Sequence, residues 1–363
     1  NKDNTSGDFG NTNVASGFSS LYNNLSGDYN TSLGCYSLFK NNYGIQNVAA
    51  GTEALYNNRD FGTNYGDFNT AIGYRALYSN READNNVAIG YRALYQNISG
   101  LYNLAIGTDA LQENTTGDHN VGIGVNAGNK TLSGLANVSI GHHALYLNTV
   151  TDGNTAVGTF ALAGNTGNTN AKYNTALGFN ALNYNTSGLR CTSLGAIADV
   201  SSPSFDNATS IGYGAIATAN NSIRLGNSST IKIECVLGII QPSDGRFKLN
   251  VSNSDVKGLE FIMCLNPVVY NFDSKEFTEH QCKNMNDSRR KMYLSQDFSK
   301  LSEVRQSGFI AQEVALAAKN SNYEFSGVVA PKNETDNYGL NYALFVVPLV
   351  KAIQQQQANL TKN

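Results

Sequence analysis

A repeat with a period of about 17 residues runs from the amino terminus to Gly226, and no other feature restricts the fold as strongly. Residues 69–80 read NTAIGYRALYSN and residues 86–97 read NVAIGYRALYQN. A glycine closes the Asn-x-Ala-x-Gly part of each copy, and most of these glycines lie one period apart: Gly17, Gly34, Gly51, Gly73, Gly90, Gly107, Gly124, Gly141, Gly158, Gly178, Gly195, Gly212 and Gly226. Self-similarity at a fixed period over more than half of a chain predicts a repeat architecture.

Each repeat carries the pattern of short strands separated by turns. In one copy Val87 and Ile89 alternate with Ala88, which is typical of a strand, and residues 93–95 form a second short apolar segment. The repeated glycine, such as Gly90, can adopt a positive φ, which suits a turn. Two short strands and two turns per repeat predict one coil of a parallel β-solenoid.

The spacing of the glycines also predicts where coils differ. One coil has too few apolar side chains to be stable alone, so coils must stack, and three packed columns would bury a second apolar face. The spacing grows by five positions before Gly73 and by three before Gly178, which fits insertions at exposed turns. The last step, from Gly212 to Gly226, is instead three positions shorter than the usual period.

The shorter repeat, ATSIGYGAIATANNSIRLGN at 208–227, carries a family resemblance. It resembles the heads of trimeric autotransporter adhesins of the YadA type, which implies a left-handed parallel β-roll wound as a homotrimer. The longer coils upstream resemble repeats of viral and bacterial tail-fibre-like proteins. The resemblance covers about residues 10–227, and handedness and trimer state follow from it rather than from the spacing.

Composition changes near residue 240. The residues before it are rich in Asn, Gly, Thr, Tyr and Ala and carry few charges, whereas the remainder is richer in Lys, Glu, Asp and Arg. We therefore expect fibre repeats over 1–226, a linker over 227–242 with a neck strand at 231–237, and a separate domain over 243–363.

Charge and hydropathy exclude several partners. The formal net charge of −3 gives no basic stripe, so we expect neither nucleic acid nor an anionic membrane surface as partner. The chain contains no apolar run long enough to span a bilayer, so we expect no membrane insertion. Because the sequence starts at Asn1 without a signal peptide, we interpret it as a fragment or a processed product.

The repeats show no pattern typical of a cofactor or metal site, and we expect neither. The five cysteines are scattered and lack a Cys-x-x-Cys motif, which favours small buried thiols. His142 and His143 are adjacent, and neighbours on a strand point to opposite faces, so they are not expected to share a metal. The aspartates lie in turns and form no isolated pair.

Four sequence blocks follow in a fixed order after residue 240. The first, SDGRFKLNV at 243–251, places a serine five positions before a lysine. The next two are GLEFIMCLNPVVYNF at 258–272 and GFIAQEV at 308–314, and Tyr342 with PLVKAIQQ at 348–355 closes the region. In this order the blocks resemble the C-terminal intramolecular chaperone of endosialidase tail spikes and related phage and viral tail fibres, over about residues 240–360.

The resemblance implies a small α+β domain that trimerises the chain, helps it fold and then cuts itself off. It makes Ser243 the nucleophile and first residue of the released fragment, Lys248 the base, and Pro242–Ser243 the scissile bond. This would be a single-turnover serine endopeptidase. The chemistry is sound by itself, because a serine hydroxyl needs a base and lysine can serve as one when burial lowers its pKa.

Two other segments of this region have predicted structure but no predicted chemistry. Residues 341–363 carry a helical apolar stripe, with Pro348 at a break or in the first turn. The polar residues 273–305 are predicted to be partly helical.

The sequence thus predicts a homotrimeric fibre or spike on a virion surface, or otherwise outside the cell, used for surface attachment. A cell-surface trimeric adhesin with a non-cleaving terminal domain is the first alternative, and a glycan-degrading tail spike is a weaker one because the repeats lack an acidic pair. A host glycan or receptor is a possible partner. Recurrent tyrosines such as Tyr74, Tyr78, Tyr91 and Tyr95 favour packing along or between columns, with contact to a glycan as the alternative.

Overall fold

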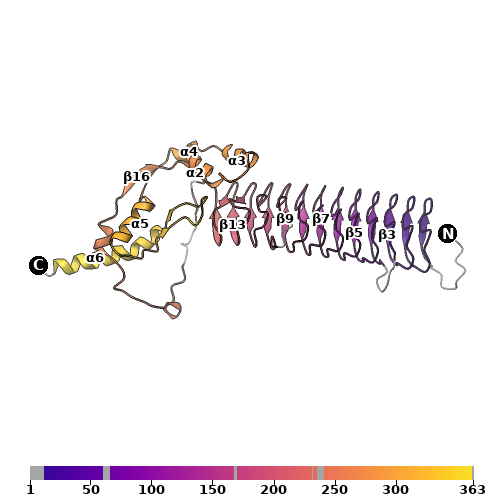
Figure 1. The fold of residues 1–363 in the computed structure, drawn as a ribbon, viewed down its shortest axis with the longest axis horizontal. Coiled ribbons are helices and arrows are strands. Elements are labelled where there is room, and N and C mark those ends of the chain that lie inside the picture. Colours follow the sequence, from indigo (N-terminus) through magenta and orange to yellow (C-terminus); the bar gives the residue numbers. More distant parts are fainter. Residues whose placement is uncertain (1–11, 60–65, 167–169, 231, 235–240, 362–363) are drawn as a thin grey trace. The chain divides into compact units, whose positions relative to one another are not determined.

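The computed structural model describes residues 12–59, 66–166, 170–230, 232–234 and 241–361. They belong to two compact units, Asn1–Asn227 and Ser228–Asn363. In the first unit the coils are stacked one after another in chain order along a single axis (Figure 1). The second unit combines helices with short strands.

A thirteen-stranded parallel sheet runs along the first unit. Its strands, in spatial order, are β1 (Val14–Ser16), β2 (Thr31–Leu33), β3 (Val48–Ala50), β4 (Thr70–Ile72), β5 (Val87–Ile89), β6 (Leu104–Ile106), β7 (Val121–Ile123), β8 (Val138–Ile140), β9 (Thr155–Val157), β10 (Thr175–Leu177), β11 (Thr192–Leu194), β13 (Ala208–Ile211) and β15 (Ser222–Leu225). Ala88 pairs with Ala105, so the register advances by one repeat per strand. The predicted parallel β-solenoid, with its regular coils and shorter last coil, is confirmed.

The two predicted insertions leave the sheet intact. The insertions fall around residues 60–65 and 167–169, which lie outside the described part of the chain. On either side of them Val48 still pairs with Thr70, and Thr155 with Thr175. The pairing therefore follows the repeat position rather than a fixed sequence distance.

The prediction of a second strand in each long coil is wrong. Residues 91–96 form a turn, in which Arg92 and Leu94 adopt left-handed φ values of 50° and 51°. The Leu94 amide donates to the Ala110 carbonyl of the next coil at 3.0 Å, so stacking holds this unusual backbone in place. A second strand occurs only at the C-terminal end of the described solenoid, where β12 (Asp199–Val200) pairs with β14 (Ile216–Ala217).

The core of the solenoid is narrow and built from small residues. The middle residue of most strands is an alanine, such as Ala88, and after the exposed β1 this alanine is fully buried. The following turn contributes an alanine and a leucine, such as Ala93 and Leu94, which are also fully buried. The first and third strand residues point away from this core, because side chains alternate along a strand.

Two ladders of buried asparagines connect the coils. In the first, each backbone N–H donates to the side-chain oxygen of the asparagine one coil earlier; Asn103 donates to Asn86 at 2.9 Å, and Asn120 to Asn103 at 2.9 Å. In the second ladder the side chains bond directly, as from Asn97 to Asn80 at 3.1 Å. Asparagine can fill such a position because its amide both donates and accepts.

Replacing one ladder residue should weaken the solenoid. Asn103→Ala leaves the buried N–H of Asn120 without its acceptor, at an expected cost of roughly 1–3 kcal/mol. Urea unfolding followed by circular dichroism measures this as a lower midpoint, and the exposed Gln96→Ala serves as the control. Equal midpoints for the two variants would show that the ladder does not stabilise the fold.

Aromatic residues stack along one side of the solenoid. The ring centroids of Phe39 and Tyr56, Tyr56 and Tyr78, and Tyr78 and Tyr95 are 5.1, 5.1 and 5.2 Å apart, with nearly parallel planes. The expected packing of these tyrosines along the column is confirmed. Each inner ring has its faces covered by its neighbours, which leaves the ring edges for any external ligand.

The described cysteines are all free, and two fit the expectation of buried thiols. Cys191 and Cys282 are buried, whereas Cys35 is partly exposed and Cys264 is exposed, and Cys235 lies outside the described residues. The Cys191 thiol donates to the Phe205 carbonyl at 3.0 Å, and burial raises its pKa to about 11. The prediction is therefore wrong for Cys264, whose side chain lies at the surface of the second unit.

The buried thiols should resist modification. At pH 8 a maleimide should label Cys264 in the folded protein, and label Cys191 and Cys282 only after unfolding, as measured by mass spectrometry. The raised pKa of Cys191 stabilises the fold below pH 9.0, its ordinary pKa, and this contribution is lost as the pH rises toward about 11. Labelling of Cys191 as fast as Cys264 would contradict the packing.

The second unit has its own aromatic core. Its elements are η1 (Gly245–Phe247), α1 (Leu259–Ile262), β16 (Val268–Asn271), α2 (Ser274–Gln281), α3 (Asp287–Leu294), α4 (Ser299–Ser302), β17 (Arg305–Gly308), α5 (Ala311–Asn320), β18 (Val328–Val329), β19 (Gly339–Leu340), η2 (Tyr342–Phe345) and α6 (Val346–Leu360). Phe261, Val314 and Phe345 meet in the core, with Phe309 packed against them. Two of the four sequence blocks thus converge on one cluster, which Phe345 joins from between Tyr342 and Pro348 of the last block.

The other expectations for this unit have mixed outcomes. The C-terminal helix is confirmed as α6, with Pro348 in its first turn, and residues 273–305 are partly helical as predicted. The neck strand is not seen at 232–234, and the rest of its range, 231 and 235–237, lies outside the described residues. No helix in the described part of the chain is long and apolar enough to cross a membrane.

Candidate functional site

The predicted serine and lysine meet across a single helical turn. Ser243 precedes η1 and Lys248 follows it, so one 3-10 turn brings the two side chains to the same side. The Lys248 Nζ donates a hydrogen bond to the Ser243 Oγ at 2.7 Å. Both residues and Pro242 are exposed, and no helix or strand includes them.

An ion pair between Asp244 and Arg246 stabilises this turn, and it was not predicted from the sequence. The Asp244 side chain caps η1 by accepting the Arg246 backbone N–H at 2.9 Å, and it also pairs with the Arg246 guanidinium at 2.6 Å. Both hydrogen bonds from Arg246 lower the pKa of Asp244. An Asp-Gly dipeptide at a helix start is a recognisable capping signal, so the residues between Ser243 and Lys248 could have been read as a turn.

The exposure of the pair limits what it can do in a single chain. A lysine in water carries its proton at neutral pH and so cannot accept one from a serine hydroxyl. A lysine becomes a general base when it is removed from water. The 2.7 Å contact therefore supplies the geometry of a serine–lysine dyad, and a covering surface would have to supply the desolvation.

The histidine pair does not lie on a strand, contrary to the prediction. His142 and His143 lie in a turn, and their Nδ1 atoms are 3.3 Å apart, so the two rings contact each other instead of pointing to opposite faces. His143 also stacks on Phe160, with burial and His142 lowering its pKa. Among the described residues no three His, Cys, Asp or Glu side chains are grouped to hold a metal.

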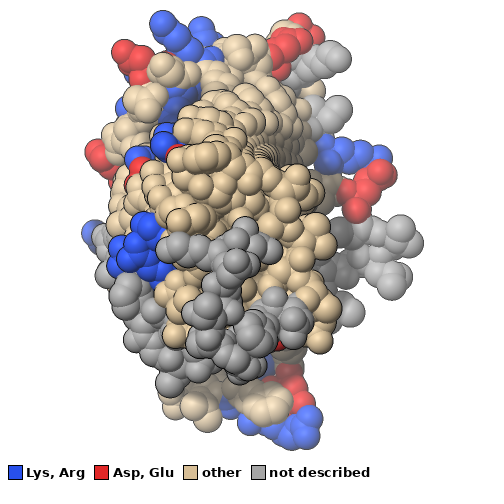
Figure 2. All heavy atoms as spheres, turned by 90° about the vertical axis from the view of Figure 1, so that its right-hand side faces the viewer, with Lys and Arg blue, Asp and Glu red and all other residues tan. Residues whose placement is uncertain are grey.

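The acidic residues of the solenoid mostly connect coils. Glu53 pairs with Arg75, and Asp109 with Arg92 one coil away at 2.9 Å. Asp67 accepts the Ile45 N–H at 2.8 Å, and burial raises its pKa. On the face in view in Figure 2, charges of both signs are scattered over a mostly uncharged surface.

Comparison with known families agrees with the C-terminal blocks. Residues 243–321 match the family model described as chaperone of endosialidase, peptidase S74. The match begins at Ser243 and includes Lys248. No curated protein and no solved structure matches the chain.

A parallel β-solenoid followed by an endosialidase-chaperone domain indicates a tail-fibre-like or spike-like protein. The predicted resemblance of the C-terminal region is confirmed over the matched residues. The last block, with Tyr342 and Pro348, lies beyond the match, although Phe345 beside it packs into the same core.

Proposed function

We propose that this protein is a homotrimeric fibre for surface attachment whose C-terminal domain, 243–363, trimerises it, assists its folding and cuts the Pro242–Ser243 bond once. The observation that carries the proposal is the 2.7 Å contact between Lys248 Nζ and Ser243 Oγ at the first residues of the chaperone match. Its setting is a virion surface or another extracellular surface.

The proposed reaction uses Ser243 on the bond that precedes it. Lys248 Nζ, once desolvated, takes the Oγ proton, and Oγ attacks the Pro242 carbonyl carbon. The C–N bond breaks as the proton passes to the Ser243 nitrogen, leaving an ester between Pro242 and Oγ. Water then hydrolyses the ester, which gives a Pro242 carboxylate and restores the Ser243 hydroxyl beside a new amino terminus.

An apolar column on the solenoid supports the homotrimer. The last residue of successive strands of the sheet points outward and is apolar from β2 onward: Leu33, Ala50, Ile72, Ile89, Ile106, Ile123, Ile140, Val157, Leu177, Leu194, Ile211 and Leu225. Several remain exposed, including Leu33, Ile72 and Leu177. A continuous apolar stripe of this length is typical of a surface that another chain covers.

Helix α6 offers a second contact surface. Val346, Val350, Ile353 and Leu360 are exposed and follow a heptad spacing, with Gln357 in the same row. The opposite side of α6, including Ala352, is buried, and α6 packs on α1. Exposed heptad positions fit a short parallel bundle in which each copy supplies one helix.

Native mass spectrometry of the uncleaved Ser243→Ala protein tests the trimer. We expect three times the chain mass, and we expect Ile353→Asp to shift the population to monomers because three carboxylates would meet in the bundle. Ala358→Asp, on an exposed part of α6 outside the heptad row, is the matched control. A monomeric Ser243→Ala protein at micromolar concentration would refute the proposal.

A polysaccharide panel then distinguishes attachment from degradation. Retention of a glycan without shortening would support attachment, and shortening of the polymer would instead favour the glycan-degrading spike.

A further inference from the structure

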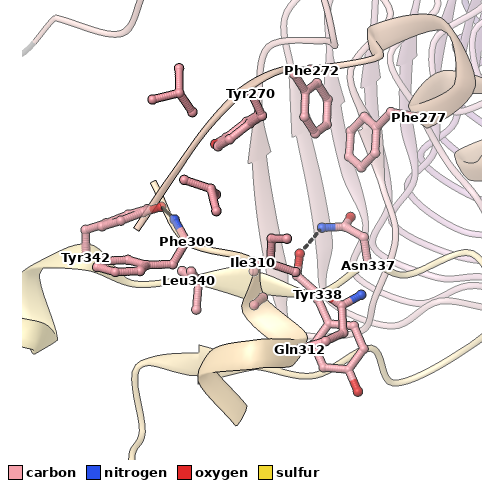
Figure 3. A pocket seen from close by; sticks show the side chains of 14 residues that line it. Tyr270, Phe272, Phe277, Phe309, Ile310, Gln312, Asn337, Tyr338, Leu340 and Tyr342 are labelled. Carbon is pink, nitrogen blue, oxygen red and sulfur yellow. Dashed lines mark hydrogen bonds between the residues drawn. The ribbon is translucent and has the colours of Figure 1, made fainter. Parts of the chain in front are cut away.

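An apolar groove opens on the surface of the second unit. It has a volume of about 700 Å³ and lies between β16, the start of α5 and the segment around β19 (Figure 3). Tyr270, Phe272 and Phe277 line one side, and Phe309, Leu340 and Tyr342 lie across from them (Figure 3). All its lining residues are uncharged.

The groove has a fixed floor. The Tyr342 hydroxyl accepts the Phe309 N–H at 3.0 Å, which ties η2 to the start of α5. At Gly308 a side chain would collide with that hydroxyl. The Phe309 and Tyr342 rings stack with their centroids 6.2 Å apart, so the apolar lining is built by the fold and does not depend on a ligand.

The same unit exposes an apolar segment beside the dyad. Phe247, Leu249 and Val251 are 81%, 86% and 81% exposed, the highest values among the large apolar residues of the chain's described part. Nothing lies within 4 Å of the position where a side chain on Gly245 would begin. Asn250 has a left-handed φ of 54°, which asparagine can leave at little cost to extend the segment.

We propose that the segment 247–251 of one copy docks into the groove of a neighbouring copy, an inference that rests on the proposed trimer. The groove and the segment belong to the same unit, yet Phe247, Leu249 and Val251 are exposed to solvent in the single chain. The segment therefore does not occupy the groove of its own copy. When extended, the segment places Phe247, Leu249 and Val251 on one side, which matches an uncharged aromatic groove. A head-to-tail contact of this kind forms a ring of three when a threefold rotation relates successive copies, as in the proposed trimer.

Contacts of Gly258 and Leu259 with α6 limit how far the segment can extend from its own copy. The Leu259 N–H donates to Gln355 Oε1 at 2.7 Å, and a side chain on Gly258 would collide with the backbone of α6. The stretch from Val251 to Gly258 spans at most about 24 Å when extended, so the docking groove must belong to an adjacent copy in direct contact.

Docking would couple cleavage to assembly. Lys248 lies between Phe247 and Leu249, so a neighbour that binds these two side chains fixes the backbone on both sides of the lysine. In an extended chain the Lys248 side chain points to the opposite side, where it can keep its contact with Ser243. The neighbouring copy would then shield the dyad from water only after the copies have met.

Site-specific photo-crosslinking in full-length Ser243→Ala protein tests the docking. We expect benzoylphenylalanine at position 249 to join two chains covalently, with the link mapped by mass spectrometry to Phe272, Phe309, Leu340 or Tyr342. The same probe at exposed Ser252, on the other side of the extended segment, should give no such link. Links within one chain, or between chains but outside the groove, would overturn the inference.

Two further measurements separate the inference from the proposed function. With Ser243 intact, Leu249→Ser should slow cleavage, whereas Leu249→Met should keep it, because only the apolar character of the side chain is needed. If native mass spectrometry shows a trimer and Leu249→Ser is cleaved at the wild-type rate, docking is refuted and the fibre proposal stands. A protein that forms no trimer would refute both.

Discussion

Ser243→Ala is expected to remain a single chain, whereas the wild-type chain is expected to separate into residues 1–242 and 243–363. The reason is that the alanine lacks the Oγ that must attack the Pro242 carbonyl, and no other hydroxyl of the described residues is placed beside Lys248. Denaturing mass spectrometry of the two proteins, expressed side by side, locates the cut to one residue. Ser252→Ala, a serine exchange in the same exposed region, should cleave normally.

Lysine variants distinguish a base from a mere positive charge. Lys248→Arg keeps the charge but cannot lose a proton at any accessible pH, so we expect it to remain uncut, as does Lys248→Met. Cleavage of Lys248→Arg at the wild-type rate would assign Lys248 a structural role. If wild type and Ser243→Ala both stay whole, the terminal unit is a permanent trimerisation domain on an adhesin-like fibre.

Gly107→Ala is expected to destabilise the solenoid by about 3–5 kcal/mol, because two separate costs combine. Gly107 has a φ of +131°, which side-chain-bearing residues rarely adopt. A Cβ there would lie 2.6 Å from the carbonyl oxygen of Gly124 in the next coil. Either the backbone must change or the stack of glycines must open locally.

Urea unfolding in the Ser243→Ala background measures this effect. Gly245→Ala makes the same exchange at a position with open space around it, so it should leave the midpoint unchanged. A midpoint for Gly107→Ala equal to that control would show that the coils separate more easily than their close approach implies. Because the same contact recurs at Gly73, Gly90 and Gly124, the prediction applies along the solenoid.

The sequence predicted the parts of this protein that depend on local pattern. The repeat period, the alternation at Val87 to Ile89 and the positive φ at Gly90 were all readable, because a strand and a glycine turn are set by neighbouring residues. The order of the C-terminal blocks likewise indicated the chaperone region and the pair Ser243 and Lys248, which the structure brings within 2.7 Å.

The features that could not be predicted from the sequence depend on hydrogen bonds to residues one coil away. Leu94 and Arg92 ordinarily avoid left-handed backbone, so residues 93–95 resembled a strand, and only hydrogen bonds to adjacent coils reveal the turn. The role of Asn103 is invisible before stacking, because its donor and acceptor contacts lie in the coils before and after it. Local periodicity thus determined which segments form strands, whereas the stacking of the coils decided how the remaining backbone bends and which polar groups are satisfied.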